Sequence, residues 1–130
     1  GGRERLVPRA DAKPLPWTGR FVDFGGGRVE YRLRPVREEM RAIFGRFLVE
    51  RFGASEAPNW IDPARPSDGT FRVPGCDGVM ATSYDGEHVG LFVPGSPPDG
   101  AACMALVRAI GAAFDAELAA GKHQALFVDD

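Results

Sequence analysis

Two neighbouring segments near the N-terminus, residues 20–24 and 28–33, mix apolar with polar residues. In the second segment Val29, Tyr31 and Leu33 alternate with charged residues, and this period of two is typical of a half-buried strand. Three glycines at 25–27 separate the segments and can adopt the positive φ angles of a tight turn. A phosphate-binding loop would need a helix directly after the glycines, whereas a strand follows. The pattern therefore predicts a β-hairpin.

Apolar residues recur at helical spacing in two longer segments. The first follows Pro35 and stops at Gly53, with apolar positions at Val36, Met40, Ile43, Phe44, Phe47, Leu48 and Phe52. The second opens at Ser96-Pro97-Pro98-Asp99 and stops at Gly121, with apolar positions at Cys103 or Met104, Val107, Ile110, Phe114 and Leu118. We expect both stripes to face a common core. The alternative for the phenylalanines of the first helix is that they line a ligand pocket.

Three short β-prone runs lie between the helices, at residues 70–73, 79–84 and 87–93. Asp85-Gly86 joins the last two and is a strong hairpin signal. Asp-Gly pairs also begin at Asp68, Asp77 and Asp99, and the spacing of a calcium-binding loop is missing, so we interpret them as turns. Residues 123–128 are nearly all apolar, which predicts a final strand well inside the sheet.

These elements predict an α+β fold, with an antiparallel or mixed sheet and two amphipathic helices in the order ββαβββαβ. The 130 residues fit one domain, which we expect over 19–130 after a proline-rich N-terminal arm at 1–18. The segment 54–69 has three prolines and no periodicity, and predicts a long ordered loop or a flexible lid. Trp60 and Ile61 within it are expected to anchor the loop on the core, the alternative being an exposed recognition patch.

The chain has no apolar run near the roughly 18 residues of a membrane span, and its first residues do not resemble an export signal. We therefore expect a cytoplasmic protein. Fourteen of the sixteen basic residues are arginine, which is typical of a GC-rich bacterial genome.

Side chains able to carry chemistry are few. Cys76 and Cys103 match no zinc or disulfide framework and are expected to be reduced, the alternative being a single disulfide if the protein is exported. Neither histidine has a metal-ligand partner at a recognised spacing. We therefore expect neither a metal nor a cofactor. Weak catalytic candidates are a Cys76–His88 thiolate and base, with carboxylates from Asp62 and Asp68 nearby, but turn formation explains these residues more simply.

Charge is distributed unevenly along the chain. Residues 1–72 carry a net charge of +4 and residues 73–130 a net charge of −6. Six arginines at alternate strand positions and in an adjacent helix turn are expected to share one surface: Arg20, Arg28, Arg32, Arg34, Arg37 and Arg41. The interpretations, in order of preference, are a solvated face, a surface for an acidic protein, and a surface for nucleic acid, which the overall acidic balance disfavours.

No motif names a reaction, so the sequence favours a non-enzymatic bacterial interaction module, such as an immunity, adaptor or chaperone-like protein. Its binding residues would be Trp60, Ile61, Arg28, Arg32, Arg34, Arg37 and Arg41, and its partner another protein or a second copy of the chain. The alternative is an enzyme or small-molecule-binding domain whose pocket lies between the sheet and the Trp60 loop and is lined by His88, Asp62, Asp68 and Cys76.

Overall fold

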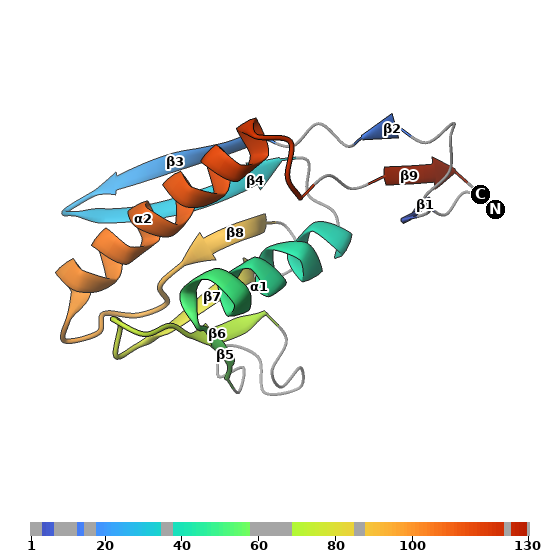
Figure 1. Cartoon of the computed structure of the whole chain (residues 1–130). Coiled ribbons are helices and arrows are strands. Elements are labelled where there is room, and N and C mark those ends of the chain that lie inside the picture. Colours follow the sequence, from blue (N-terminus) through green and yellow to red (C-terminus); the bar gives the residue numbers. More distant parts are fainter. Residues whose placement is uncertain are drawn as a thin grey trace.

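The computed structural model describes residues 4–6, 13–14, 18–34, 38–57, 69–84, 88–123 and 126–129, and side chains over 18–34, 41–57, 69–82 and 90–123. Its main element is a six-stranded antiparallel sheet with the order β3-β4-β8-β7-β6-β5 (Figure 1). The strands are β3 (Thr18–Gly25), β4 (Arg28–Arg34), β5 (Ser55–Glu56), β6 (Thr70–Arg72), β7 (Val79–Tyr84) and β8 (His88–Phe92). The predicted α+β fold is confirmed.

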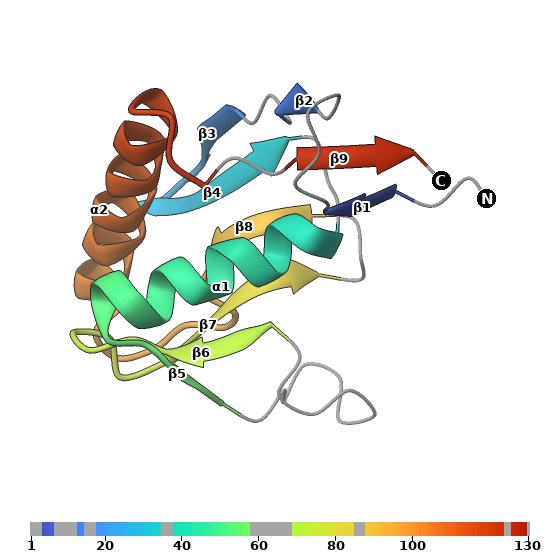
Figure 2. The ribbon, with the colours of Figure 1, turned by 45° about the vertical axis from the view of Figure 1, so that its right-hand side comes forward.

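Two helices, α1 (Glu38–Phe52) and α2 (Gly100–Ala119), cover one face of this sheet. α1 packs on β7 and β8, and α2 packs on β3 and β4, as Figures 1 and 2 show from two sides. The alternation in β4 follows from this arrangement, because Val29, Tyr31 and Leu33 point under the helices and are each only 1% exposed. We call the helix-covered face the inner face and the opposite one the outer face.

Aromatic side chains fill the space between the two helices. Phe44 and Phe47 of α1 are almost fully buried, and each ring lies 4.9 Å from the ring of Phe114 on α2. Edge-on contacts of this kind add to the free energy gained by burying the rings. The aromatic stripe of the first helix is therefore core, as predicted, and does not line a pocket.

Gly111 allows α2 to approach the sheet closely. A Cβ atom at this position would lie 2.6 Å from ring atoms of both Phe21 and Tyr31. Gly19 on β3 has the same role from the other side, since its Cβ would lie 2.1 Å from the hydroxyl of Tyr31. These short distances leave no room for a side chain at either glycine.

The last strand is not part of the main sheet. The sequence predicts one strand at 123–128 inside that sheet, whereas β9 (Leu126–Asp129) is the middle strand of a separate three-stranded sheet between β1 (Glu4–Leu6) and β2 (Lys13–Pro14). His123 precedes it with a positive φ of 59°, which a strand does not allow. Both partners of β9 come from the predicted N-terminal arm. Pro14 is tolerated there because β2 is an edge strand.

Of the helices in the described ranges, none combines the length and apolar character that crossing a bilayer needs.

Candidate functional site

The outer face of the β3–β4 hairpin carries a group of arginines around an exposed aromatic ring. Arg20 lies directly opposite Arg32 in the strand register, and Thr18 lies opposite Arg34. Phe24 is 53% exposed, and the guanidinium of Arg32 lies 5.6 Å from the centre of its ring. We call Arg20, Phe24, Arg32 and Arg34 the arginine–aromatic face.

Only one of the three arginines on this face has an ion-pair partner among the described residues. Arg32 forms an ion pair with Glu30 at 3.1 Å, and Glu30 bonds both the Nε and Nη2 groups of that guanidinium. Within the described residues neither Arg20 nor Arg34 has an ion-pair partner, and both are exposed. Like charges placed directly opposite on neighbouring strands repel, so Arg20 and Arg32 disfavour the isolated hairpin and favour an added anion.

Two of the predicted binding arginines are left out of this group, each for a different reason. The guanidinium of Arg28 donates to the carbonyl oxygens of Val93 at 2.7 Å and Gly95 at 3.1 Å, and so ties β4 to the connection between β8 and α2. Arg41 is part of α1, which packs on the inner face, so the sheet separates it from the hairpin arginines. The guanidinium of Arg28 is therefore engaged by backbone carbonyls, and Arg41 lies apart from the hairpin arginines. Arg37 lies outside the described residues.

The cysteines contradict a second expectation. Cys76, in the turn between β6 and β7, and Cys103, in the first turn of α2, form a disulfide with their Cα atoms 5.0 Å apart. Both side chains are buried, at 9% and 0% exposure. The prediction of reduced cysteines failed because a sequence separation of 27 residues gives no local signal of the pairing. With its sulfur in a disulfide, Cys76 has no thiolate and is excluded as a nucleophile in this form.

Asp99 lies beside the disulfide, at the N-terminus of α2. Its carboxylate accepts a hydrogen bond from the backbone N–H of Asp77 at 2.8 Å and lies 3.4 Å from the sulfur of Cys103. One oxygen of Asp99 and the two sulfurs lie within 4.8 Å of one another, which is the spacing of metal ligands. The sulfurs are already bonded to each other, so this group is not a metal site in the oxidised protein.

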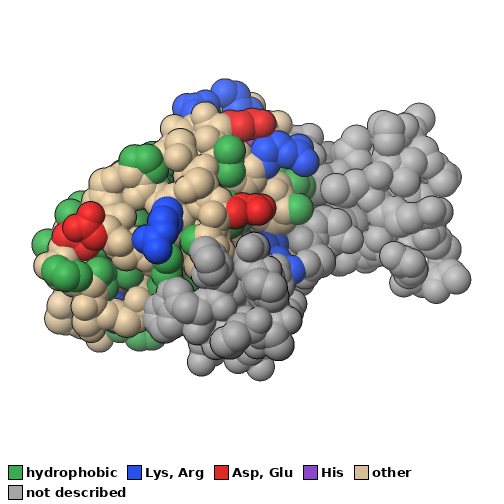
Figure 3. Space-filling view, turned by 90° about the horizontal axis from the view of Figure 1, so that it is seen from below, with side chains coloured by type: hydrophobic (Ala, Val, Ile, Leu, Met, Phe, Trp, Pro, Cys, Tyr) green, Lys and Arg blue, Asp and Glu red, His purple; other side chains and the backbone are tan. Residues whose placement is uncertain are grey.

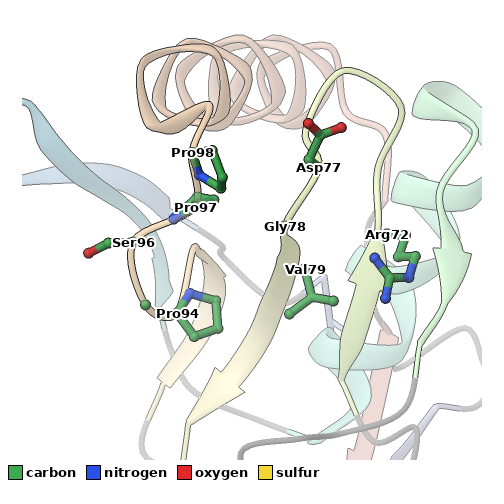
Figure 4. Close-up of a pocket in the computed structure, with 9 residues that line it drawn as sticks. Arg72, Asp77, Gly78, Val79, Pro94, Ser96, Pro97 and Pro98 are labelled. Atoms are coloured by element: carbon green, nitrogen blue, oxygen red, sulfur yellow. The ribbon is translucent and has the colours of Figure 1, made fainter.

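A groove of about 410 Å³ adjoins the disulfide. Figure 4 shows Gly78 and Val79 between Arg72 on one side and the prolines of the β8–α2 connection on the other. Its lining residues are Arg72, Asp77, Gly78, Val79, Pro94, Gly95, Ser96, Pro97 and Pro98. The walls approach closely at Gly78, where a Cβ would lie 3.2 Å from Pro97 and 3.9 Å from the sulfur of Cys76. The disulfide and the Asp77–Asp99 bond therefore hold the two walls together.

Most of the predicted pocket residues lie outside the part of the chain that the structure describes. This applies to Trp60, Ile61, Asp62 and Asp68, and the side chain of His88 is likewise not described. The pocket beside the Trp60 loop therefore stays a prediction. Cys76 is no longer a candidate nucleophile for it.

Two partly buried polar contacts were not anticipated from the sequence. The hydroxyl of Tyr31 donates to Asp115 of α2 at 2.5 Å. Burial, and then the hydrogen bond and negative charge of Asp115, raise the pKa of Tyr31 well above its ordinary value. Two residues further along α2, Glu117 lies 2.8 Å from His123 and 3.3 Å from Arg51. These contacts join α2 to β4 and to α1, so they serve the packing of the two layers.

The ring of His123 is part of the core boundary. It stacks on Phe114 at 4.9 Å and meets Phe47 edge-on at 5.5 Å, while its Nε2 contacts Glu117. Within the described residues no hydroxyl or thiol bonds to this imidazole. The arrangement therefore closes the end of the core and lacks the nucleophile that a histidine and a carboxylate would activate.

Phe24 is the site residue that sequence reasoning missed. Its signal was present, because Arg20, Val22 and Phe24 share one face of a strand with a period of two. On the coloured part of the surface in Figure 3, seen from below, basic and acidic side chains are mixed among apolar ones.

No family model, curated protein or solved structure matches the chain.

Proposed function

We propose that this domain is a non-enzymatic protein-interaction module that binds an acidic segment of a partner protein on the arginine–aromatic face. The observation behind the proposal is the pair of opposed guanidiniums, Arg20 and Arg32, next to the exposed ring of Phe24. Arginines and aromatic rings are enriched in protein interfaces and supply much of the binding free energy there. Carboxylates fit the planar guanidinium group, so an acidic partner complements this face.

The experiment is affinity capture from lysate of the native organism, with variants that change the same net charge at different places. The test variant is Arg20→Glu with Arg34→Glu. The control is Arg46→Glu with Lys122→Glu, both exposed and away from the hairpin. We expect acidic proteins to be retained by wild type and by the control, and lost with the test variant. Equal retention by both variants, or none by wild type at low salt, would overturn the proposal.

A second candidate function is the binding of a small anionic ligand in the groove. Arg72 is exposed there beside Val79 and the prolines, which together offer a cation and an apolar wall. A metabolite thermal-shift screen tests this function, with Arg72→Ala as the variant. If no compound raises the melting temperature of wild type more than that of Arg72→Ala, groove binding is excluded.

The disulfide supports an oxidising compartment over the cytoplasmic location predicted from the sequence. Structural disulfides persist outside the cytosol and are rare within it, where thiols are kept reduced. Alkylation of native cells lysed directly into denaturant, before any reductant is added, tests the compartment, because denaturation exposes both buried sulfurs. Cys76 and Cys103 should both resist labelling, and labelling of both would favour the cytoplasm.

A further inference from the structure

β3 is an open edge of the main sheet. Within the described residues it pairs with β4 alone, and its eight residues make it the longest strand of the sheet. The opposite edge is β5, which has only two residues. Very short edge strands resist pairing with other chains, whereas a long one presents a row of free N–H and C=O groups. β3 is therefore the edge at which a further strand can add.

We propose that β3 pairs in antiparallel fashion with β3 of a second copy of this chain, centred on Phe21. Side chains alternate between the two faces of a strand. If the two copies form one continuous sheet with all helices on one side, each inner-face residue of β3 must lie opposite an inner-face residue of the other β3. Pairing Phe21 with Phe21 of the second copy meets this condition. It also pairs Arg20 with Val22 and Thr18 with Phe24.

Charge favours the register centred on Phe21 over the register centred on Arg20. A register centred on Arg20 would place two arginines directly opposite each other, which is destabilising. The register centred on Phe21 places no like charges directly opposite and uses the whole run from Thr18 to Phe24. The irregularity between Asp23 and Gly25 falls at the end of that run and limits the pairing to it.

The exposed ring of Phe21 gives the pair an apolar contact. Phe21 is 37% exposed although its ring packs 5.3 Å from that of Tyr31 on the inner face. Arg108 of α2 lies over the same ring at 6.0 Å. In the proposed pair the two Phe21 rings meet and each covers the exposed part of the other, which removes apolar surface from water.

The neighbouring surface of α2 leaves room for the second copy. Arg108 and Asp115 mark the side of the helix that faces β3 and β4, through their contacts with Asp23 and Tyr31. Ala112 lies one turn from both of them and is exposed. A methyl group at this position does not obstruct a second helix. The inference does not depend on the proposed partner binding, although it would join two arginine–aromatic faces into one surface.

The experiment is sedimentation of the full chain over protein concentrations from about 5 to about 200 µM. We expect a monomer–dimer equilibrium for wild type and at least about tenfold weaker association for Phe21→Asp. Because Phe21 also packs on Tyr31, Ala112→Arg is the second variant, placed at an exposed site where folding is unaffected. Val49→Asp on α1 is the control, since Val49 is 45% exposed and remote from β3.

Hydrogen exchange shows which strand lies in the dimer interface. In the dimer the amides of residues 19–23 should exchange at least about tenfold more slowly at high than at low protein concentration. The inference is overturned if wild type sediments as a monomer throughout. It is also overturned if Phe21→Asp and Ala112→Arg both dimerise like the control, because association would then use another surface.

Discussion

Removing the disulfide should cost a large part of the stability of this domain. The perturbation is the double variant Cys76→Ala and Cys103→Ala, which leaves no reactive thiol. The two cysteines are 27 residues apart, and the loop-closure entropy of a crosslink over that separation corresponds to about 3.6 kcal/mol at 25 °C. Small domains are stable by only about 5–15 kcal/mol, so the double variant should stay folded with little reserve.

Urea unfolding followed by circular dichroism measures the loss. At a slope of about 1.5 kcal/mol per molar urea, 3.6 kcal/mol moves the midpoint down by about 2.4 M. Wild type in excess dithiothreitol should unfold close to the double variant, and the double variant should not respond to dithiothreitol. A loss below about 1 kcal/mol would refute the reasoning, because the crosslink would then add little to the constraints already present in the unfolded chain.

Three further substitutions test other contacts. Tyr31→Phe should cost about 1–3 kcal/mol by leaving Asp115 without its hydrogen bond in urea unfolding. Folded Tyr31 also keeps the proton that the unfolded chain loses above about pH 10. Above that pH the unfolding free energy of wild type should therefore fall with rising pH more steeply than that of Tyr31→Phe, by about 1.4 kcal/mol per pH unit. Equal slopes would contradict this. Gly111→Ala should lower the melting temperature by the equivalent of about 1–3 kcal/mol, and an unchanged melting temperature would show that α2 can move away from the sheet. Phe24→Ser should change stability by less than about 0.5 kcal/mol while weakening partner capture, and a large loss of stability would mean that its ring is structural.

The hairpin and both helices were predictable because their periods are local. Val29, Tyr31 and Leu33 alternate with charged residues, and this alternation alone assigns one side of β4 to the core. Phe44, Phe47 and Phe114 fall on helical stripes that must be buried against something, and the two stripes bury each other. The runs at 70–73, 79–84 and 87–93 correspond to β6, β7 and β8.

The position of the last strand was not predictable in the same way. Its apolar residues call for burial, but they do not specify which sheet provides it. β1 and β2, near the N-terminus, pair with β9 at the opposite end of the chain, and His123 just before β9 has a positive φ that interrupts an extended strand. Strand pairing over such a sequence separation leaves no periodic trace in the local pattern.

The candidate site likewise has features that the sequence predicts and features that only the tertiary structure shows. The sequence by itself determined that Arg20, Arg32 and Arg34 lie on the polar face of a hairpin, because a period of two decides the side of a strand. Only the tertiary structure decided that Arg28 bonds carbonyl groups about 65 residues away, that Arg41 lies on the other side of the sheet, and that Cys76 meets Cys103. These contacts depend on where distant segments come to rest. A sequence pattern encodes which side of an element is buried, and the packing of the whole chain decides what that side meets.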